Sequence, residues 1–324
     1  MNAECRVGRA SGPLSLRERG PLLALALLCC VQGCRARDSR PATDRLQVFA
    51  GIPPVAYLVE RIGGPRVEVH VLLQPGQNPH VFQISPRQVV AMDKASLFFK
   101  ISMPFENTLV EKLEARQGRI RVIDASRAIA KRIMEDECGE TGGDHEHEVG
   151  EPDPHVWLCP ANLKIMAATI ADALVEAAPA DAARFRANRA VLDAELDALD
   201  GRLRRALRPF QGQTFYVFHP AFGYFADAYG LQEKAVQLGG QMPTGKYLYA
   251  LIKQAKAEGV KTVFVQPEFD PQSMQGVADA LGAQIVQING LGENVTADIE
   301  DIAAKIEKAM RESGPHETIP KKHT

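Results

Sequence analysis

Short apolar strands alternate with helical segments along most of this chain, and one much longer helical stretch interrupts the alternation. The pattern first runs from Leu46 to Ile123 and restarts at Thr214. Strands that alternate with helices predict a mostly parallel sheet covered by helices on both faces. We therefore expect an α/β protein with two lobes, each holding a mostly parallel four-stranded sheet, joined by one long rigid helix.

The first lobe is predicted to occupy residues 46–178. Pro53 opens a helix that Gly63 ends, and Ser85 caps the next one. Alternating or wholly apolar segments supply the strands. The expected strands are 46–50, 67–73, 97–101 and 120–123, and a further helix covers 106–116.

Two helical stretches follow, at 162–178 and 181–207. The second carries an apolar stripe among charged residues and would be about 40 Å long at ~1.5 Å per residue. We expect residues 179–208 to link the two lobes, and a long surface helix is the alternative interpretation. The stripe consists of Phe185, Leu192, Leu196, Leu199 and Leu203.

The second lobe is predicted over residues 209–324, where strands and helices alternate again. A chain of 324 residues that is 45% hydrophobic can form two domains with real cores. Two lobes bridged by one helix imply a cleft between them. The expected strands are 214–218, 234–236, 260–265 and 283–288, and the expected helices are 221–229, 244–259, 271–281 and 296–310.

Three histidines, His80, His155 and His219, follow the ends of strand-like or loop segments, where binding groups gather in open α/β sheets. His80 and His155 would line the cleft from the first lobe, and His219 from the second. Three imidazoles suit a borderline-soft divalent cation such as zinc, with one coordination position left open. The pattern predicts a metal-capture protein rather than an enzyme.

The segment 135–153 is acidic, rich in glycine and poor in apolar residues, which predicts a mobile loop within the first lobe. It contains His145 and His147. Two interpretations stay open. The segment is either a solvated insertion whose histidines have no role, or a collector that raises the local metal concentration near the site.

The N-terminus has the features of a targeting segment. Its apolar run, 21–31, is shorter than the ~20 residues that span a bilayer, but it fits the core of a signal peptide. The run ends at Val-Gln-Gly-Cys34, which resembles the lipobox of bacterial lipoproteins. We expect 1–34 to be a signal peptide and 35–45 a polar tether, with the protein exported to the periplasm or cell envelope. A lipid anchor on Cys34 and plain secretion are the two alternatives.

Four of the six cysteines lie in this leader or at its end, which leaves Cys138 and Cys159. A pair of cysteines in an oxidising compartment is compatible with a disulfide. Two free thiols are the alternative.

Three motifs carry the histidines: GQNPH at 76–80, DPHVWL at 153–158 and FHPAFGY at 218–224. These motifs resemble those of the zinc/manganese solute-binding proteins of bacterial metal ABC importers (cluster A-I), and the resemblance extends over 46–311. In that family two α/β lobes are linked by a rigid helix, and the metal lies between them. The resemblance implies that His80, His155 and His219 are metal ligands. It also implies that zinc is the transported cargo and that a monomeric chain delivers it to the membrane permease of an ABC importer.

The chain departs from the family pattern at two positions. Where the family usually has an acidic residue after the last strand, this chain has Asn289. The family's Glu-Pro-Gln-like turn is here Gln266-Pro-Glu268, which moves the carboxylate by two positions. We expect water as the fourth ligand, with Glu268 and Asn289 as alternatives.

Neutral imidazoles favour zinc over manganese, which prefers carboxylate oxygens. A manganese- or iron-binding protein of the same family is the alternative. Because the imidazoles must be unprotonated, zinc capture is expected to weaken below about pH 6.

A zinc hydrolase is the rival class, and it would need a general base beside the metal, for which Glu268 and Glu106 are the weak choices. An adhesin or a structural metalloprotein is the third alternative. The net charge of -2 and the lack of a basic run with interleaved aromatics argue against nucleic acid as a partner.

Overall fold

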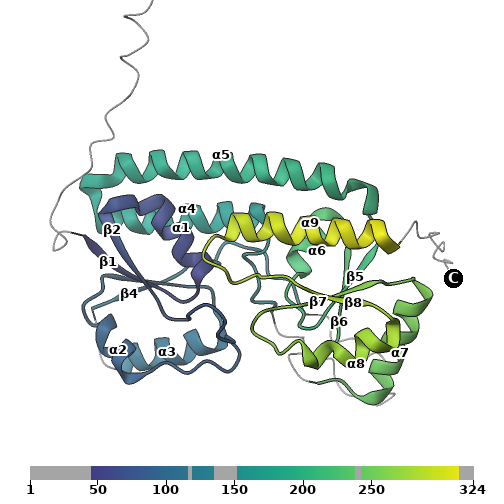
Figure 1. Ribbon diagram of the computed structural model, residues 1–324. Coiled ribbons are helices and arrows are strands. Elements are labelled where there is room, and N and C mark those ends of the chain that lie inside the picture. Colours follow the sequence, from purple (N-terminus) through teal and green to yellow (C-terminus); the bar gives the residue numbers. More distant parts are fainter. Residues whose placement is uncertain (1–44, 116–118, 135–151, 238–241, 314–324) are drawn as a thin grey trace, which may run out of the picture. The chain divides into compact units, whose positions relative to one another are not determined.

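Two parallel four-stranded sheets form the framework of the described residues and confirm the predicted α/β class (Figure 1). The computed structural model describes residues 45–115, 119–134, 152–237 and 242–313. The first sheet has the order β2-β1-β3-β4 and the second the order β6-β5-β7-β8. The strands are β1 (Leu46–Ala50), β2 (Val67–Val71), β3 (Leu97–Lys100), β4 (Arg121–Asp124), β5 (Thr214–Val217), β6 (Gln232–Ala235), β7 (Thr262–Val265) and β8 (Gln284–Gln287).

Both sheets have the same topology, in which the strand order reverses beside the first strand. β1 pairs with β2 on one side and β3 on the other, and β5 pairs likewise with β6 and β7. In open parallel sheets, ligands bind outside the carboxyl ends of the strands at such a switch point. In each half of the molecule, the carboxyl end of the sheet beside its first strand is therefore suited to binding a ligand.

Helices connect these strands close to their predicted positions. In the first half they are α1 (Pro53–Gly63), α2 (Pro86–Met92), α3 (Pro104–Ala115) and α4 (Pro160–Ala177). In the second half they are α6 (Gly223–Tyr229), α7 (Gly245–Ala257), α8 (Gln272–Leu281) and α9 (Val295–Ser313). The predicted cap at α2 is confirmed, because the Ser85 hydroxyl accepts from the Gln88 N–H, while the Gln88 side chain accepts from the Ser85 N–H.

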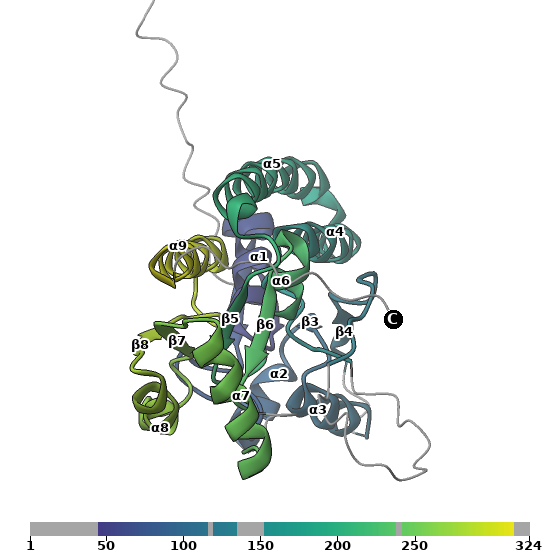
Figure 2. The same ribbon diagram turned by 90° about the vertical axis from the view of Figure 1, so that its right-hand side faces the viewer.

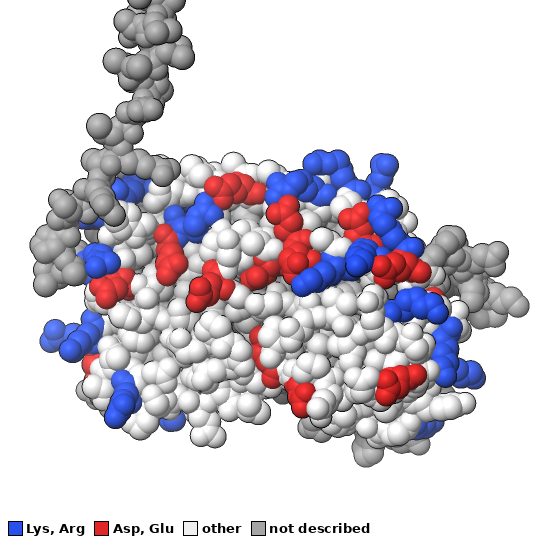
Figure 3. All heavy atoms as spheres, viewed as in Figure 1, with Lys and Arg blue, Asp and Glu red and all other residues white. Residues whose placement is uncertain are grey.

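The long helix α5 (Ala182–Leu207) contacts elements of both halves. It packs on α1 and α4 at one end and on α6 and α9 at the other, and it lies over α1 and α4 in Figures 1 and 2. Its predicted apolar stripe is confirmed as its buried face, to which Leu207 is added. In Figure 3, charged side chains of both signs gather where α5 and α9 lie, as expected for a helix with only one apolar face.

The core is continuous between the two halves. One buried apolar cluster includes Phe98 of the first sheet, Leu196 of α5, Ile299 of α9 and Phe225 of α6. A second, smaller cluster fills the space between the second sheet and the helices α7 and α8. Residues 41–324 form one compact unit by their contacts, so the lobe boundaries stay predictions.

The strand predicted at 234–236 is observed as β6, beginning two residues earlier. Its first residues are Gln232, Glu233 and Lys234, which give no apolar signal. The segment is a strand because its backbone completes the edge of the second sheet beside β5. Pairing, rather than side-chain hydrophobicity, determines its bounds.

Several predicted features lie outside the described residues. These are the leader, the tether up to residue 44, Cys138, His145 and His147. Cys159 is described, and it is a buried free thiol. No helix of the described residues is long and apolar enough to cross a membrane.

Candidate metal centre

His80 lies in the loop between β2 and α2, held by a local turn. The Asn78 side-chain oxygen accepts from the His80 N–H at 2.9 Å, and the Val81 N–H donates to the Asn78 carbonyl at 3.3 Å. Pro79 is buried, whereas His80 is the exposed member of the three histidines. The turn thus brings this ring to the mouth of a pocket.

His155 is fixed by the residue two positions before it. The buried Asp153 carboxylate accepts from the His155 N–H at 2.9 Å and from ring Nδ1–H at 2.8 Å. Because a carboxylate oxygen can only accept here, Nδ1 carries a proton, and Nε2 is the ring nitrogen left for another partner.

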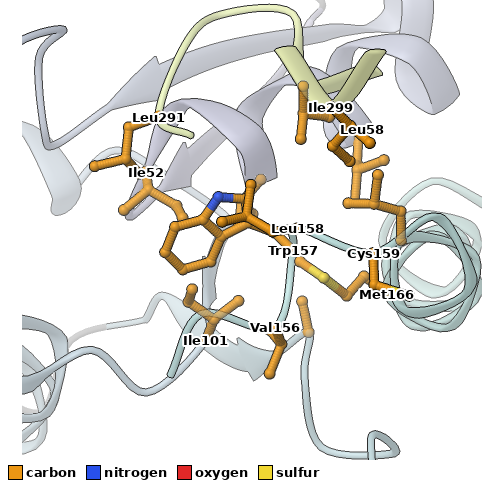
Figure 4. Packing of buried hydrophobic residues seen from close by; sticks show 14 of the residues in the cluster. Ile52, Leu58, Ile101, Val156, Trp157, Leu158, Cys159, Met166, Leu291 and Ile299 are labelled. Atoms are coloured by element: carbon orange, nitrogen blue, oxygen red, sulfur yellow. The ribbon is translucent and has the colours of Figure 1, made fainter. Parts of the chain in front are cut away.

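The loop after His155 is anchored by Trp157. Its Nε1–H donates to the Gly290 carbonyl at 2.6 Å, and its ring packs among apolar residues that include Ile52 and Ile101 (Figure 4). A Cβ added at Gly290 would lie only 3.3 Å from the Leu158 side chain, so the glycine permits this close approach. This packing joins the His155 loop to the turn after β8.

His219 lies two residues after the end of β5, at the switch point of the second sheet. Gln266 clamps its backbone, donating to the His219 carbonyl at 2.7 Å and accepting from its N–H at 3.4 Å. The Gln237 side-chain oxygen accepts from ring Nδ1–H at 3.0 Å. Nε2 is buried and has no hydrogen-bond partner. An unpartnered buried acceptor of this kind is costly unless something else binds it.

The three rings converge. Their centroids are 5.8 Å apart for His80 and His155, 4.6 Å for His80 and His219, and 5.3 Å for His155 and His219. One nitrogen of each ring lies within 4.8 Å of the others. Tetrahedral zinc with bonds of ~2.0–2.1 Å separates its ligand atoms by about 3.3 Å, so small side-chain movements would complete the coordination.

The electrostatics favour the neutral form of His80 and His219. Burial, followed by the charges of His155 and His80, lowers the pKa of His219 well below its ordinary value. Although His80 is partly open to solvent, protein atoms crowd its pocket side, and this desolvation together with His155 lowers its pKa too. Unprotonated rings are the form that binds a metal ion.

The pocket around these rings is mainly apolar, with Glu268 and Gln266 among its lining residues. Burial raises the pKa of Glu268. In the described residues, the group of possible ligand atoms within 4.8 Å contains the three histidines and not Glu268. The Asn289 side-chain oxygen accepts from the Leu291 N–H at 2.9 Å, and Asn289 is not among the lining residues.

Glu106, the other weak choice for a general base, is not among the lining residues either. It is fully buried, and one carboxyl oxygen accepts from the N–H groups of Ile101 and Met103 at 3.0 and 2.8 Å. Burial raises the pKa of Glu106 to about 7. Its contacts are those of a group that holds the turn between β3 and α3.

The sequence did not predict the residues that orient the rings. Asp153 was recognisable, because an Asp two positions before a His commonly accepts from that residue's N–H. Gln237 gave no signal, since it follows a polar edge strand and reaches His219 only through the pairing of β6 with β5.

The fold and the pocket define a class, a two-lobed α/β protein with a histidine cluster between its halves. The model of the family described as "Zinc-uptake complex component A periplasmic" (ZnuA) matches residues 48–312. This chain belongs to that family.

Related sequences and structures match this chain over most of its length. The high-affinity zinc uptake system protein ZnuA of Paracoccus denitrificans (strain Pd 1222) is 30% identical over 305 residues, covering 84% of this chain and 89% of the relative. A crystal structure of ZnuA matches with a TM-score of 0.75 at 32% identity, covering 82% of this chain and 100% of that one. A ZnuA deletion mutant with zinc bound matches with the same score and identity, covering 82% of this chain and 98% of its own.

Proposed function

We propose that this chain captures zinc with His80, His155 and His219 and delivers it to the membrane permease of an ABC importer. Three neutral imidazoles form a donor set that zinc accepts and that offers manganese none of the carboxylates it prefers. Zinc is the cargo of the family, and a zinc-bound relative has the same fold at 32% identity.

The observation that carries this proposal is the His219 ring. Its Nδ1–H is committed to Gln237, and its Nε2 is buried without a partner within reach of the other two rings. A cation bound at this position would give the buried acceptor the partner that it lacks.

Localisation and partners follow from the family and the leader. The family is periplasmic, and we propose that residues 1–34 direct export, with Cys34 as the site of a lipid anchor. We propose that the mature chain acts as a monomer whose lobes, 46–178 and 209–324, are linked by 179–208. Water is proposed as the fourth ligand, with Glu268 at the pocket wall.

We propose a binding protein rather than an enzyme, since the family consists of solute-binding components. A hydrolase would place a general base against a metal-bound water. Glu268 is the carboxylate that lines the described pocket, so it is the residue on which such an activity would depend.

Zinc titration against a chromophoric chelator tests the proposal. We expect one zinc per chain with nanomolar affinity, about -12 kcal/mol. Outer-sphere substitutions cost about 10–100-fold in metal affinity, so His155→Ala, which removes a ligand, is expected to cost at least ~100-fold. His70→Ala is the matched control, because His70 lies on β2 and bonds to Gln47.

Two further readouts separate the alternatives. Chelation should remove zinc and leave the far-ultraviolet circular dichroism unchanged, whereas loss of the fold would indicate a structural metal. Zinc-dependent turnover of an ester that disappears in Glu268→Gln would indicate a hydrolase. Either result would overturn the proposed function.

A further inference from the structure

Two short extended stretches of the first half meet just before His155. Ile133 and Pro152 form an antiparallel bridge, and the Asp153 N–H donates to the Arg132 carbonyl at 2.8 Å. We call these four residues, Arg132, Ile133, Pro152 and Asp153, the neck. The neck is directly continuous with the metal centre, because Asp153 also supplies the carboxylate that holds His155.

A tyrosine from the second half binds both strands of the neck. The Tyr224 hydroxyl accepts from the Arg132 N–H at 2.9 Å and donates to the Asp153 carbonyl at 3.2 Å. Tyr224 is the second residue of α6 and is only 8% exposed. Removing the Tyr224 hydroxyl would leave the Arg132 N–H and the Asp153 carbonyl without this hydrogen-bond partner, at a site that water reaches poorly.

The Arg132 side chain makes a second contact with the same helix. Its guanidinium donates to the Asp227 carboxylate at 2.9 Å. It also lies against Gly223, where a methyl group would collide with it. The glycine at the start of α6 therefore leaves room for the Arg132 guanidinium.

These contacts link the segments that carry two of the three histidines, at a place outside the candidate metal centre. The first residue of α6 follows His219 by only four positions, and the neck ends two residues before His155. The rings of His155 and His219 lie 5.3 Å apart. The neck and α6 thus lie next to two histidines that come from different halves of the molecule.

We propose that Tyr224 is a positioning residue for zinc capture, which rests on the function proposed above. Its hydroxyl ties the neck to α6, and it thereby holds Asp153 and His155 in place opposite His219. If the Tyr224 contact raises the affinity for zinc, then bound zinc must stabilise the Tyr224 contact by the same free energy.

The test compares Tyr224→Phe with Tyr229→Phe. Tyr229 ends the same helix and is buried to a similar degree, but its hydroxyl donates to Asp200 of α5 at 3.2 Å. We expect Tyr224→Phe to weaken zinc binding about tenfold in the chelator titration, as for other groups that orient a ligand. We expect Tyr229→Phe to lower the midpoint of thermal unfolding of the zinc-free protein and to leave zinc affinity within about twofold of wild type.

Unchanged zinc affinity in Tyr224→Phe would overturn the inference, and so would an equal loss in both variants, which would indicate a general effect of stability. Hydrogen exchange of the Arg132 amide in the wild-type protein gives an independent test that needs no variant. Zinc should slow this exchange, and exchange at the same rate with and without zinc would also overturn the inference. If the wild-type chain bound no zinc, the proposed function itself would fail, so the two failures are distinguishable.

Discussion

In His155 and His219, one ring nitrogen donates a hydrogen bond to a protein acceptor. The other ring nitrogen of each residue is left to bind a shared metal ion. The acceptors differ, since one is the Asp153 carboxylate and the other the Gln237 amide oxygen. A carboxylate makes its imidazole a stronger donor to a metal than a neutral amide does. His155 is therefore expected to contribute more to zinc affinity than His219.

The acid sensitivity of zinc binding follows from the pKa shifts of the rings. Burial lowers the pKa of His80 and His219 below the ordinary value of 6.5, so protons bind these rings less tightly than free histidine. Protons then compete with zinc only at lower pH. Because the pKa of His80 is lowered to about 4, we expect the zinc affinity of the intact protein to be flat from about pH 7.5 to 6 and to fall only as the pH approaches ~4, lower than the pH ~6 expected for free histidine. A competition titration in small pH steps measures this, and a decline that already starts near pH ~7 would contradict the lowered pKa values.

The three histidines of the candidate site were predictable from the sequence, and the orientation of their rings was not. His80, His155 and His219 stand out because each sits in a Pro- or Gly-containing turn where a strand-like or loop segment ends. Gln237 follows a strand whose polar sequence gives no binding signal, and Tyr224 closes the FHPAFGY motif, in which the sequence assigns a role to His219 alone. They reach the site only through strand pairing and through the contact between the halves.

At the scale of single elements, the first turn of α3 depends on a buried carboxyl group. Glu106 is fully buried and accepts from the backbone N–H groups of Ile101 and Met103. Its other oxygen has no partner and lies against Gly51, where a larger residue would collide with it. The turn is thus formed at the cost of burying an ionisable group.

This burial makes the stability of the fold depend on pH. The folded-state pKa of Glu106, about 7, lies above its ordinary value of 4.5, so the folded chain binds the proton more tightly than the unfolded chain. This contribution to stability is full below pH ~4.5 and is lost as the pH rises towards ~7. Between about pH 5 and pH 8, the free energy of unfolding of wild type should fall by about 2 kcal/mol relative to Glu106→Gln, which does not titrate.

Urea unfolding at several pH values measures this difference. Glu111→Gln is the control, because Glu111 lies on the same helix and is exposed. Its stability should follow that of wild type at every pH. A difference between Glu106→Gln and wild type that does not change with pH would contradict the account.

Element bounds were predictable where capping or apolar periodicity marks them, as at α2 and α5. The observed bounds differ from the predicted ones where contacts with neighbouring elements determine them, as at β6 and α9. The helix α9 extends from Val295 to Ser313 instead of 296–310. At the end of α9, the Arg311 guanidinium lies over the Phe210 ring and the Gln284 side chain donates to Glu312, and the sequence of the helix alone marks neither contact.

For the whole molecule, the shared core limits how the two halves move. α5 contacts α1 and α4 on one side and α6 and α9 on the other, and the main apolar cluster runs through all of them. Opening the halves widely would expose this apolar surface to water. Zinc capture is therefore expected to involve a small adjustment of loops and rings, with His80, the exposed member of the three, moving most.

Direct competition between zinc and manganese tests the central claim that three imidazoles from both halves hold one cation. We predict that equimolar zinc displaces manganese fully from the wild-type chain, that a ~100-fold excess of manganese does not displace zinc, and that His219→Ala loses tight zinc binding. Manganese bound as tightly as zinc, or zinc affinity unchanged in His219→Ala, would contradict the account.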